Sequence, residues 1–504
     1  MNLLLLAPLL GPMLAAIAAL LFQRNRSLQK ATGLAGPLVI LSAGVALLVA
    51  VERHGIQVTS LGDWPAPFGI VMVADLFSSI MLVLTGIVSL AAVIFSFTTV
   101  RAGRRRFGYY PLVNLMLVGV SGALLTGDVF NLFVWFELML ISSFVLMALG
   151  GHQRRLEGAV KYVSINLLSS AFFLMGVGLL YSVTGTLNMA DLAIKIKEVD
   201  NPGVVTAIAM LFLVSFGIKS AAFPLFFWLP ASYHTPSVDV TALFSGLLTK
   251  VGMYALIRLF TLVFVNDTGF THTLIMVLAA FTMVVGVLGA VAQYDFRRLL
   301  SFHIVSQIGY VLMGLAIFTP AALAGAIMFL AHNILVKTSL FFVGGILLRV
   351  TGTESLTKMG GMYRSKPVLA LLFAIPALSL AGLPPSSGFV SKLALVRAGF
   401  HAEAYVIIGI SLVVSLMTMY SMTKIWNAVF WKPAPILQKT DAGRRLPMIS
   451  TRERVMLYAP AVFLITLSVL MGLVAQPVFE LTTRAAESLI DPSVYIEKVL
   501  GTRS

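Results

Sequence analysis

Residues 219–258 read KSAAFPLFFWLPASYHTPSVDVTALFSGLLTKVGMYALIR, a largely apolar stretch with a lysine at each of two points. The later part, around Lys250, is long and apolar enough for a membrane-spanning helix. The earlier part follows Lys219 with Pro224 and Pro230, and proline removes a backbone donor and interrupts a helix. The stretch therefore predicts a broken membrane helix followed by an intact one, each carrying a charged side chain.

Composition extends this picture to the whole chain. Of the 504 residues, 59% are hydrophobic and 11% are charged, and the mean hydropathy is +0.97. Because one bilayer span takes roughly 20 apolar residues, the chain has room for a dozen or more. We therefore predict an all-α, polytopic membrane protein that forms a single transmembrane domain over residues 1–504.

The apolar runs predict about 14 transmembrane helices. The first run lacks a preceding basic segment and a following cleavage site, so we expect a retained helix and not a signal peptide. The predicted spans are 3–22, 31–51, 70–100, 109–126, 129–149, 160–184, 204–223, 238–262, 270–293, 299–318, 320–348, 367–400, 403–430 and 456–475.

The distribution of basic residues tests that count. With fourteen spans, 22 of the 35 Lys and Arg residues fall in loops on one side and 6 on the other, while 7 lie within or at the ends of spans. Positive charge gathers on the cytoplasmic side of membrane proteins. We therefore predict a multi-pass membrane protein with external termini and a cytoplasmic loop at 431–455. The same placement of the +15 net charge argues against a nucleic-acid partner.

Several charged side chains fall inside predicted spans, where each costs roughly 2.5 to 3.5 kcal/mol and marks an ion or proton route. They are Glu137 in NLFVWFELMLISSF, Lys219, Lys250, His332 and Lys337 in FLAHNILVKTSLFF, and Lys392 in GFVSKLALV. A carboxylate and an amine that pair and separate in a low-dielectric interior move protons. We expect these residues to form a proton relay, and static ion pairs that only fix helix packing are the alternative. Arg258 and Arg397, near span ends, are expected to snorkel.

Helix breakers accompany two of these lysines. Pro224, Pro230 and Pro236 follow Lys219, and LPPSSG precedes Lys392. Such breaks survive at membrane depth only where protein or water surrounds them, and matching breaks in two halves are typical of inverted-repeat transporters. The breaks fall in the seventh and twelfth spans. We therefore predict two inverted five-helix repeats, residues 109–262 (helices 4–8) and 270–430 (helices 9–13).

These segments resemble the antiporter-like subunits that are shared by respiratory complex I, membrane-bound hydrogenases and the multisubunit Mrp-type sodium/proton antiporters. The resemblance rests on the motifs quoted above, on RRLLSFHIVSQIGYVLMGL from Arg297 and on AGLPPSSGFVSKLAL, and it covers roughly residues 70–430. It implies a fourteen-helix fold with a chain of buried charges along the membrane midplane.

By match to the family, each buried residue receives an expected role. Glu137 and Lys219 resemble the pair that opens and closes, and Lys250 resembles the central relay. His332 and Lys337 look like the next step, and Lys392 the terminal lysine. His234 matches the histidine that follows the WLP sequence.

Two departures indicate the branch of the family. Complex I members commonly read WLPDAH where this chain has WLPASYH, and His332 and Lys337 are five apart where four is common; both weaken direct transfer of the roles of His234 and His332. The remaining motif variants and the compact length most resemble the D subunits of the Mrp antiporters. This resemblance implies a proton-translocating subunit of a hetero-oligomeric Na⁺/H⁺ antiporter, a secondary transporter and not an enzyme.

Other readings remain open at this stage. A proton-pumping subunit of a complex I-type or hydrogenase-type redox assembly would use the same relay, and a packing scaffold would carry the same charges. A stand-alone transporter of organic ions is disfavoured, since no substrate-sized polar cluster is evident. Neither a P-loop nor a paired-histidine motif is present, and the chain has no cysteine for thiolate metal sites or iron–sulfur clusters. We expect no cofactor and no metal in this chain. Asp75 and Asp128 could offer ligands to sodium, but their positions near span ends favour helix capping.

Overall fold

The computed structural model describes residues 2–100, 102–433 and 450–501. Residues 434–449, most of the predicted cytoplasmic loop at 431–455, lie outside the described residues. Within the described part, twelve helices are long and apolar enough to cross a membrane. They are α1 (Leu3–Leu21), α2 (Arg26–His54), α3 (Leu76–Thr99), α6 (Val129–Ala148), α7 (Gln153–Thr184), α9 (Pro202–Ser220), α11 (Val238–Leu262), α12 (Thr268–Ala292), α13 (Phe296–Ile317), α14 (Pro320–Thr351), α18 (Tyr405–Trp426) and α19 (Thr451–Leu473).

Two shorter apolar helices, α5 (Tyr109–Leu125) and α16 (Pro367–Ala381), stand where the fourth and twelfth spans are predicted. The predicted multi-pass helical fold is confirmed, and fourteen spans remain the predicted count. The other helices are α4 (Ala102–Arg106), α8 (Met189–Lys195), α10 (Trp228–Ser232), α15 (Met362–Ser365), α17 (Ser387–His401), α20 (Ala475–Ile490) and α21 (Ser493–Leu500), and a π-helical turn (Asn427–Trp431) extends α18.

One small sheet is not among the predicted elements. Strand β1 (Gln57–Ser60) pairs antiparallel with β2 (Val71–Ala74), with Gln57 opposite Ala74 and Ser60 opposite Val71. The sequence analysis predicts a span from residue 70 onward, because VMVA is apolar. In the structure these residues instead belong to a hairpin that closes one end of the bundle.

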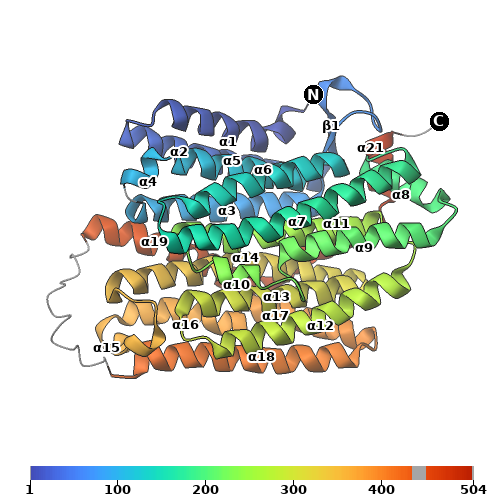
Figure 1. Cartoon of the computed structure of the whole chain (residues 1–504). Coiled ribbons are helices and arrows are strands. Elements are labelled where there is room, and N and C mark those ends of the chain that lie inside the picture. Colours follow the sequence, from blue (N-terminus) through green and yellow to red (C-terminus); the bar gives the residue numbers. More distant parts are fainter. Residues whose placement is uncertain (1, 101, 434–449, 502–504) are drawn as a thin grey trace.

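The long helices lie side by side in one bundle (Figure 1). Both termini lie at the same end, together with α8, β1 and α21, while α4 and α15 lie at the opposite end. Two termini at one end agree with an even number of crossings.

The centre of the bundle is built from α11, α13 and α14. All residues of α11 are buried, and α14 is buried from Ala322 to Leu347. The two helices approach closely at Gly246, because a methyl group there would lie 2.6 Å from the Thr338 hydroxyl of α14. Lys250 and Lys337 belong to these two helices, so the fold places both lysines deep inside protein.

The first predicted helix break is present. Helix α9 ends at Ser220, Ala221 takes a left-handed conformation with φ of 60°, and α10 follows as a single short turn. The carbonyls freed by the break find protein donors: the Trp228 indole donates to Ile218 O at 3.0 Å. Hydrogen bonds of this kind let irregular backbone exist within a membrane protein.

The second predicted break separates α16 from α17. Gly382, with φ of 92°, ends α16, and α17 starts at Ser387 after two consecutive prolines. Helix α19 covers the break, and a methyl group on its Gly472 would lie 2.5 Å from Pro385 O. Protein therefore surrounds both interruptions.

Two loops at opposite ends of the bundle are built alike (Figure 1). In each, an aspartate that caps one helix forms an isolated antiparallel bridge with a residue that follows another: Asp128 with Asn188, and Asp295 with Ser355. Asp295 follows Asp128 by 167 residues, and Ser355 follows Asn188 by the same number (295 − 128 and 355 − 188). The preceding helices, α7 and α14, both have 32 residues.

The threonines at these loops repeat one hydrogen-bond pattern. The Thr184 hydroxyl donates to Thr186 O at 3.1 Å, and the Thr351 hydroxyl donates to Thr353 O at 3.1 Å. The backbone N–H of Thr186 donates back to the Thr184 hydroxyl, as that of Thr353 does to Thr351. The same 167-residue spacing holds here (351 − 184).

Candidate functional site

The first predicted pair, Glu137 and Lys219, is joined through a third side chain. The Ser170 hydroxyl of α7 donates to Oε1 of Glu137 on α6, and Lys219 Nζ on α9 donates to the Ser170 hydroxyl at 3.3 Å. The Lys219 ammonium also lies 5.1 Å from the centre of the Phe136 ring, a distance at which the ring face attracts a cation. The sequence analysis does not identify Ser170.

A small cavity extends from Lys219 toward α11. It has a volume of about 10 Å³ and is lined by Asn166, Trp228 and Leu248 among others. This is close to the minimum that one water needs. Because Leu248 precedes Lys250 by two residues, a single water here would lie on the way from Lys219 to α11.

Lys250 and Lys337 differ in how their ammonium groups are satisfied. Lys250 is 2% exposed and donates to Ser245 O of its own helix. Lys337 is fully buried, and among the described residues its Nζ has no hydrogen-bond partner. Lys337 is also close enough to Lys250 and Lys392 for electrostatic interaction. A charge on one of these lysines therefore opposes a charge on the next.

His332 is tied to the second break. Its Nδ1 lies 2.9 Å from the Ser387 hydroxyl at the start of α17, and Ser387 in turn contacts the Ser468 hydroxyl of α19 at 3.1 Å. The other ring nitrogen, Nε2, is buried without a partner among the described residues. His332 can therefore exchange a proton at Nε2 while Nδ1 keeps its hydrogen bond with Ser387.

Lys392 uses the carbonyls that the second break leaves free. Its Nζ donates to Leu380 O at 3.0 Å and to Ala381 O at 3.2 Å, at the end of α16. It also donates to the Ser415 hydroxyl of α18 at 3.1 Å. A helix carboxyl end attracts a cation, so the break itself forms the binding place of this lysine.

The structure does not bring His234 into this row. It follows α10 and is half-buried, with Nδ1 2.9 Å from Pro230 O. Burial is the main cause that lowers the pKa of His234, and its charged neighbours include Asp295, Arg297, Arg298 and Glu157. The sequence match identified the position in the motif but not its distance from the other charges.

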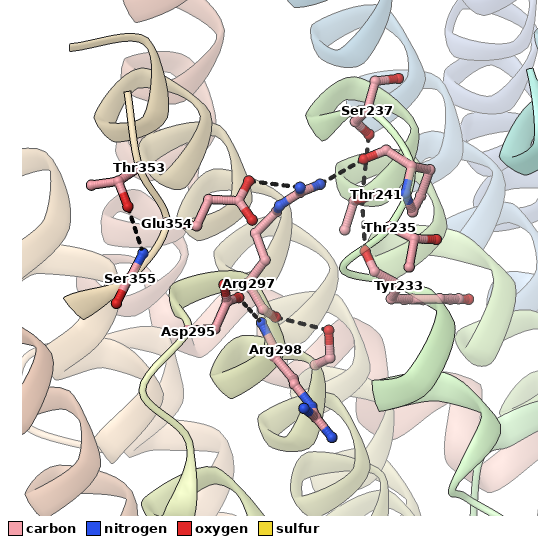
Figure 2. A network of polar contacts seen from close by, with 12 residues as sticks. Tyr233, Thr235, Ser237, Thr241, Asp295, Arg297, Arg298, Thr353, Glu354 and Ser355 are labelled. Carbon is pink, nitrogen blue, oxygen red and sulfur yellow. Dashed lines mark hydrogen bonds and ion pairs between the residues drawn. The ribbon is translucent and has the colours of Figure 1, made fainter. Parts of the chain in front are cut away.

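Figure 2 shows the polar network around Arg297 and Asp295. Arg297 donates to Pro236 O at 2.6 Å, in the loop that leads into α11, and pairs with Glu354 at 2.6 Å. Asp295 caps α13 by accepting from Arg298 N. These contacts fix the start of α11 against α13 and the loop after α14.

Two further polar residues are buried in α13 and are not found by the sequence analysis. His303 of α13 is fully buried, with Nε2 2.9 Å from the Ser421 hydroxyl and Nδ1 without a partner among the described residues. It is close enough to Lys337 and Lys392 for electrostatic interaction. Gln307, one helical turn later, has both amide atoms unpaired among described residues. The four-residue spacing of His303 and Gln307 within an apolar span is the sequence feature that could have identified them.

The two candidate aspartates at span ends act as caps. Asp75 accepts from Ser78 N at 2.8 Å at the start of α3, and Asp128 accepts from Asn131 N at 2.7 Å at the start of α6. Asp75 also pairs with Arg258 at 2.5 Å. The prediction that Arg258 snorkels is therefore wrong: its side chain is 7% exposed because a buried carboxylate holds it. Arg397 is exposed, as snorkelling requires.

The described residues contain no group of three or more His, Asp or Glu side chains that could hold a metal ion. The site is instead a row of single charged groups on α6, α9, α11, α14 and α17, with a histidine on α13. Such a row, inside a bundle with two broken helices, defines an ion-translocating membrane subunit of the antiporter-like class.

Comparisons with known proteins specify the family. The family described as "NADH:quinone oxidoreductase/Mrp antiporter, TM" matches residues 126–418. The chain is 47% identical to the Na⁺/H⁺ antiporter D subunit of Alkalihalophilus pseudofirmus, over 99% of this chain and 100% of the relative. It is 43% identical to the Na⁺/H⁺ antiporter D subunit of Bacillus subtilis, again over 99% and 100%. The chain belongs to this family, on the branch of the antiporter D subunits.

Similar solved structures support the same family assignment. A chain of the Mrp complex from Dietzia sp. DQ12-45-1b superposes with a TM-score of 0.90 at 35% identity, covering 99% of this chain and 100% of that one. A chain of the membrane-bound sulfane sulfur reductase, an archaeal respiratory membrane complex, gives 0.89 at 25% identity, over 98% and 99%. The predictions of a multi-pass membrane fold and of a transporter subunit that is not an enzyme are confirmed.

Proposed function

We propose that this chain carries protons through the membrane domain of a multisubunit Na⁺/H⁺ antiporter. The observation that carries the proposal is the row of charged side chains from the half-buried Glu137 to the buried Lys392, inside an apolar bundle. The partners are the other subunits of an Mrp-type complex, and the transported ions are protons and Na⁺. The names of the relatives, Na⁺/H⁺ antiporter D subunits, support Na⁺ as the exchanged ion.

The proposed route starts at Glu137 and Lys219. While Ser170 links the two groups, each stabilises the charge of the other; when the link opens, the ammonium loses that support and releases its proton more readily. A water in the adjoining small cavity would pass the proton toward Lys250. Lys219 and Glu137 thereby act as a gate.

The later steps run along α14 to the second break. A proton on Lys250 repels one on Lys337, and a proton on Lys392 does the same. Charge therefore moves forward as each neighbouring lysine loses its proton. His332, with one free ring nitrogen, is proposed as the carrier between them. His234 lies outside this row and is proposed to act only at the end of the bundle, beside Arg297.

We propose that residues 109–262 and 270–430 are inverted repeats. The loops around Asp128 and Asp295, with the same bridges, the same threonine hydrogen bonds and the same 167-residue spacing, support this division. They lie at opposite ends of the bundle (Figure 1), as inversion requires. Each repeat then contributes one broken helix and its lysine.

The proposed orientation places the end with α4 and α15 in the cytoplasm. The predicted excess of Lys and Arg on that side supports it. The protein would then lie in the prokaryotic cytoplasmic (inner) membrane with both termini external.

A second candidate function is proton pumping within a redox complex. The similarity to a chain of an archaeal respiratory complex favours it. The relay would be the same in both cases, so the coupled partner decides between them.

The test uses everted membrane vesicles from a host that lacks its own antiporters and expresses the complete operon. A respiratory substrate builds a proton gradient that a fluorescent dye reports, and Na⁺ is then added. The proposal predicts that Na⁺ dissipates the gradient, and that Glu137→Gln abolishes this response at equal assembly. If Na⁺ does not change the proton gradient in the intact complex, the redox complex is favoured. If Glu137→Gln prevents the complex from assembling, a packing scaffold is favoured.

A further inference from the structure

A second polar cavity lies apart from the row of buried charges, at the basic end of the bundle. Its volume is about 540 Å³, and it lies between the first turns of α2, the end of α3, α4 and the first turns of α19. A water molecule takes roughly 30 Å³, so the cavity can hold a group much larger than water.

Four cationic side chains line this cavity: Arg26, Lys30, Arg105 and Arg452. Among the described residues, none of the four has a hydrogen-bond or ion-pair partner for its charged group. Glu453 is the carboxylate in the lining, and it is already engaged: Oε1 pairs with Arg349 at 3.3 Å, and Oε2 accepts from Ser450 N at 3.4 Å. The cavity therefore holds positive charge that the described residues leave largely uncompensated.

Three of these cations are close enough to affect the fourth, Lys30. The charges of Arg26, Arg105 and Arg452 all act on the Lys30 ammonium, and like charges at such distances oppose one another. The Lys30 ammonium also lies 4.7 Å from the centre of the Phe97 ring, so its position is fixed by contact with α3. A bound anion would relieve this repulsion.

The cavity lies at the ends of helices that are long and apolar enough to cross a membrane. Helices α2 and α19 both begin at the cavity and run away from it into the apolar bundle. Further along, Leu38 and Val45 of α2 and Val462 of α19 are exposed. A ligand with a charged head at the cavity and apolar chains along these helices fits this arrangement.

We propose that this cavity binds the phosphate group of one anionic phospholipid, with Lys30 and Arg105 as its central contacts. Arg guanidinium and Lys ammonium groups are the side chains that bind phosphate, and basic pockets at the cytoplasmic membrane surface recognise anionic headgroups. The site is separate from the proton route and belongs to a different part of the fold.

The test measures lipid retention by native mass spectrometry. The complete complex is stripped of lipid in detergent and then titrated with phosphatidylglycerol, with phosphatidylcholine or with inorganic phosphate. The site predicts one retained phosphatidylglycerol per chain, roughly tenfold weaker binding in the double variant Lys30→Gln/Arg105→Gln, and near-normal binding in Arg105→Lys. The matched control Arg24→Gln/Arg454→Gln removes two basic residues of the same end that do not line the cavity, and it should retain the lipid.

Equal retention of phosphatidylglycerol and phosphatidylcholine would overturn the proposal, as would equal retention by the double variant and the control. Saturation by inorganic phosphate alone, with displacement of phosphatidylglycerol, would assign the cavity to a free anion instead of a lipid. Circular dichroism of each variant checks the fold, so weaker binding cannot be mistaken for unfolding.

Discussion

Glu137 and Lys219 make no direct ion pair; a single hydroxyl group, that of Ser170, accepts from the lysine and donates to the carboxylate. This arrangement differs from a closed salt bridge, because one rotation of a serine side chain breaks the hydrogen-bonded link between the two charged groups. A gate of this kind can open without moving a helix.

Ser170→Ala should therefore lower antiport about tenfold, since hydrogen bonds to charged groups contribute roughly 1.5–3 kcal/mol. Ser170→Thr keeps the hydroxyl and should retain most of the activity. The measurement is the Na⁺-dependent dye response in vesicles. Ser182→Ala is the matched control, because Ser182 lies on the same helix, is exposed and bonds only to Leu179 O. Unchanged antiport in Ser170→Ala would show that the Ser170 hydroxyl is not part of the gate.

His303 should prove necessary for transport, although the sequence analysis does not identify it. His303→Ala removes the ring that lies near both Lys337 and Lys392, and we expect at least a tenfold loss of antiport with normal assembly. His272→Ala is the control: this buried histidine of α12 packs on Phe318 and lies outside the row. Equal effects of the two substitutions on transport would argue against a place for His303 in the relay.

The Arg258–Asp75 pair should matter for stability. Removing one partner of a buried ion pair costs roughly 3–5 kcal/mol, so Arg258→Ala should lower the thermal unfolding midpoint in detergent clearly. Arg484→Ala breaks the exposed pair with Glu52, 53% and 37% exposed, and should change stability by no more than about 1 kcal/mol. Similar midpoints for the two variants would contradict the assignment of Arg258.

The pH dependence of stability should contain a contribution from His234. Burial lowers the pKa of His234 below its ordinary value of 6.5. As the pH falls through that value, the unfolded chain therefore binds a proton that the folded chain does not yet bind. Stability is therefore lost as pH falls below about 6.5 and is present above it. His234→Gln should flatten this acid-side loss, measured as unfolding midpoints between about pH 7.5 and about pH 5. His152→Gln, at an exposed position, is the control, and a wild-type slope in His234→Gln would contradict the prediction.

The sequence predicts the fold and much of the row for clear physical reasons. Lysines inside apolar runs are costly, and prolines next to them mark broken helices, so Lys219, Lys250 and Lys392 can be found from one sequence. The breaks at Ala221 and Gly382 lie where those prolines indicate.

The parts that could not be predicted depend on partners far away in the chain. Serines are common in apolar helices, so nothing marks Ser170 before α6 and α9 are placed beside α7. Arg258 lies near a span end, and only the folded structure places Asp75 against it. His234 belongs to a recognisable motif, but its distance from the row follows from the course of the chain after α10.

The proposed route passes protons through Lys250, and a single substitution can test this step. The complete operon is expressed with Lys250→Ala, and with Lys161→Ala as control, since Lys161 lies in an exposed pair with Glu157. After blotting confirms equal assembly, Na⁺ is added to energised everted vesicles. We predict that Na⁺ collapses the proton gradient in the wild type and in Lys161→Ala but not in Lys250→Ala. A full response in Lys250→Ala would contradict the relay.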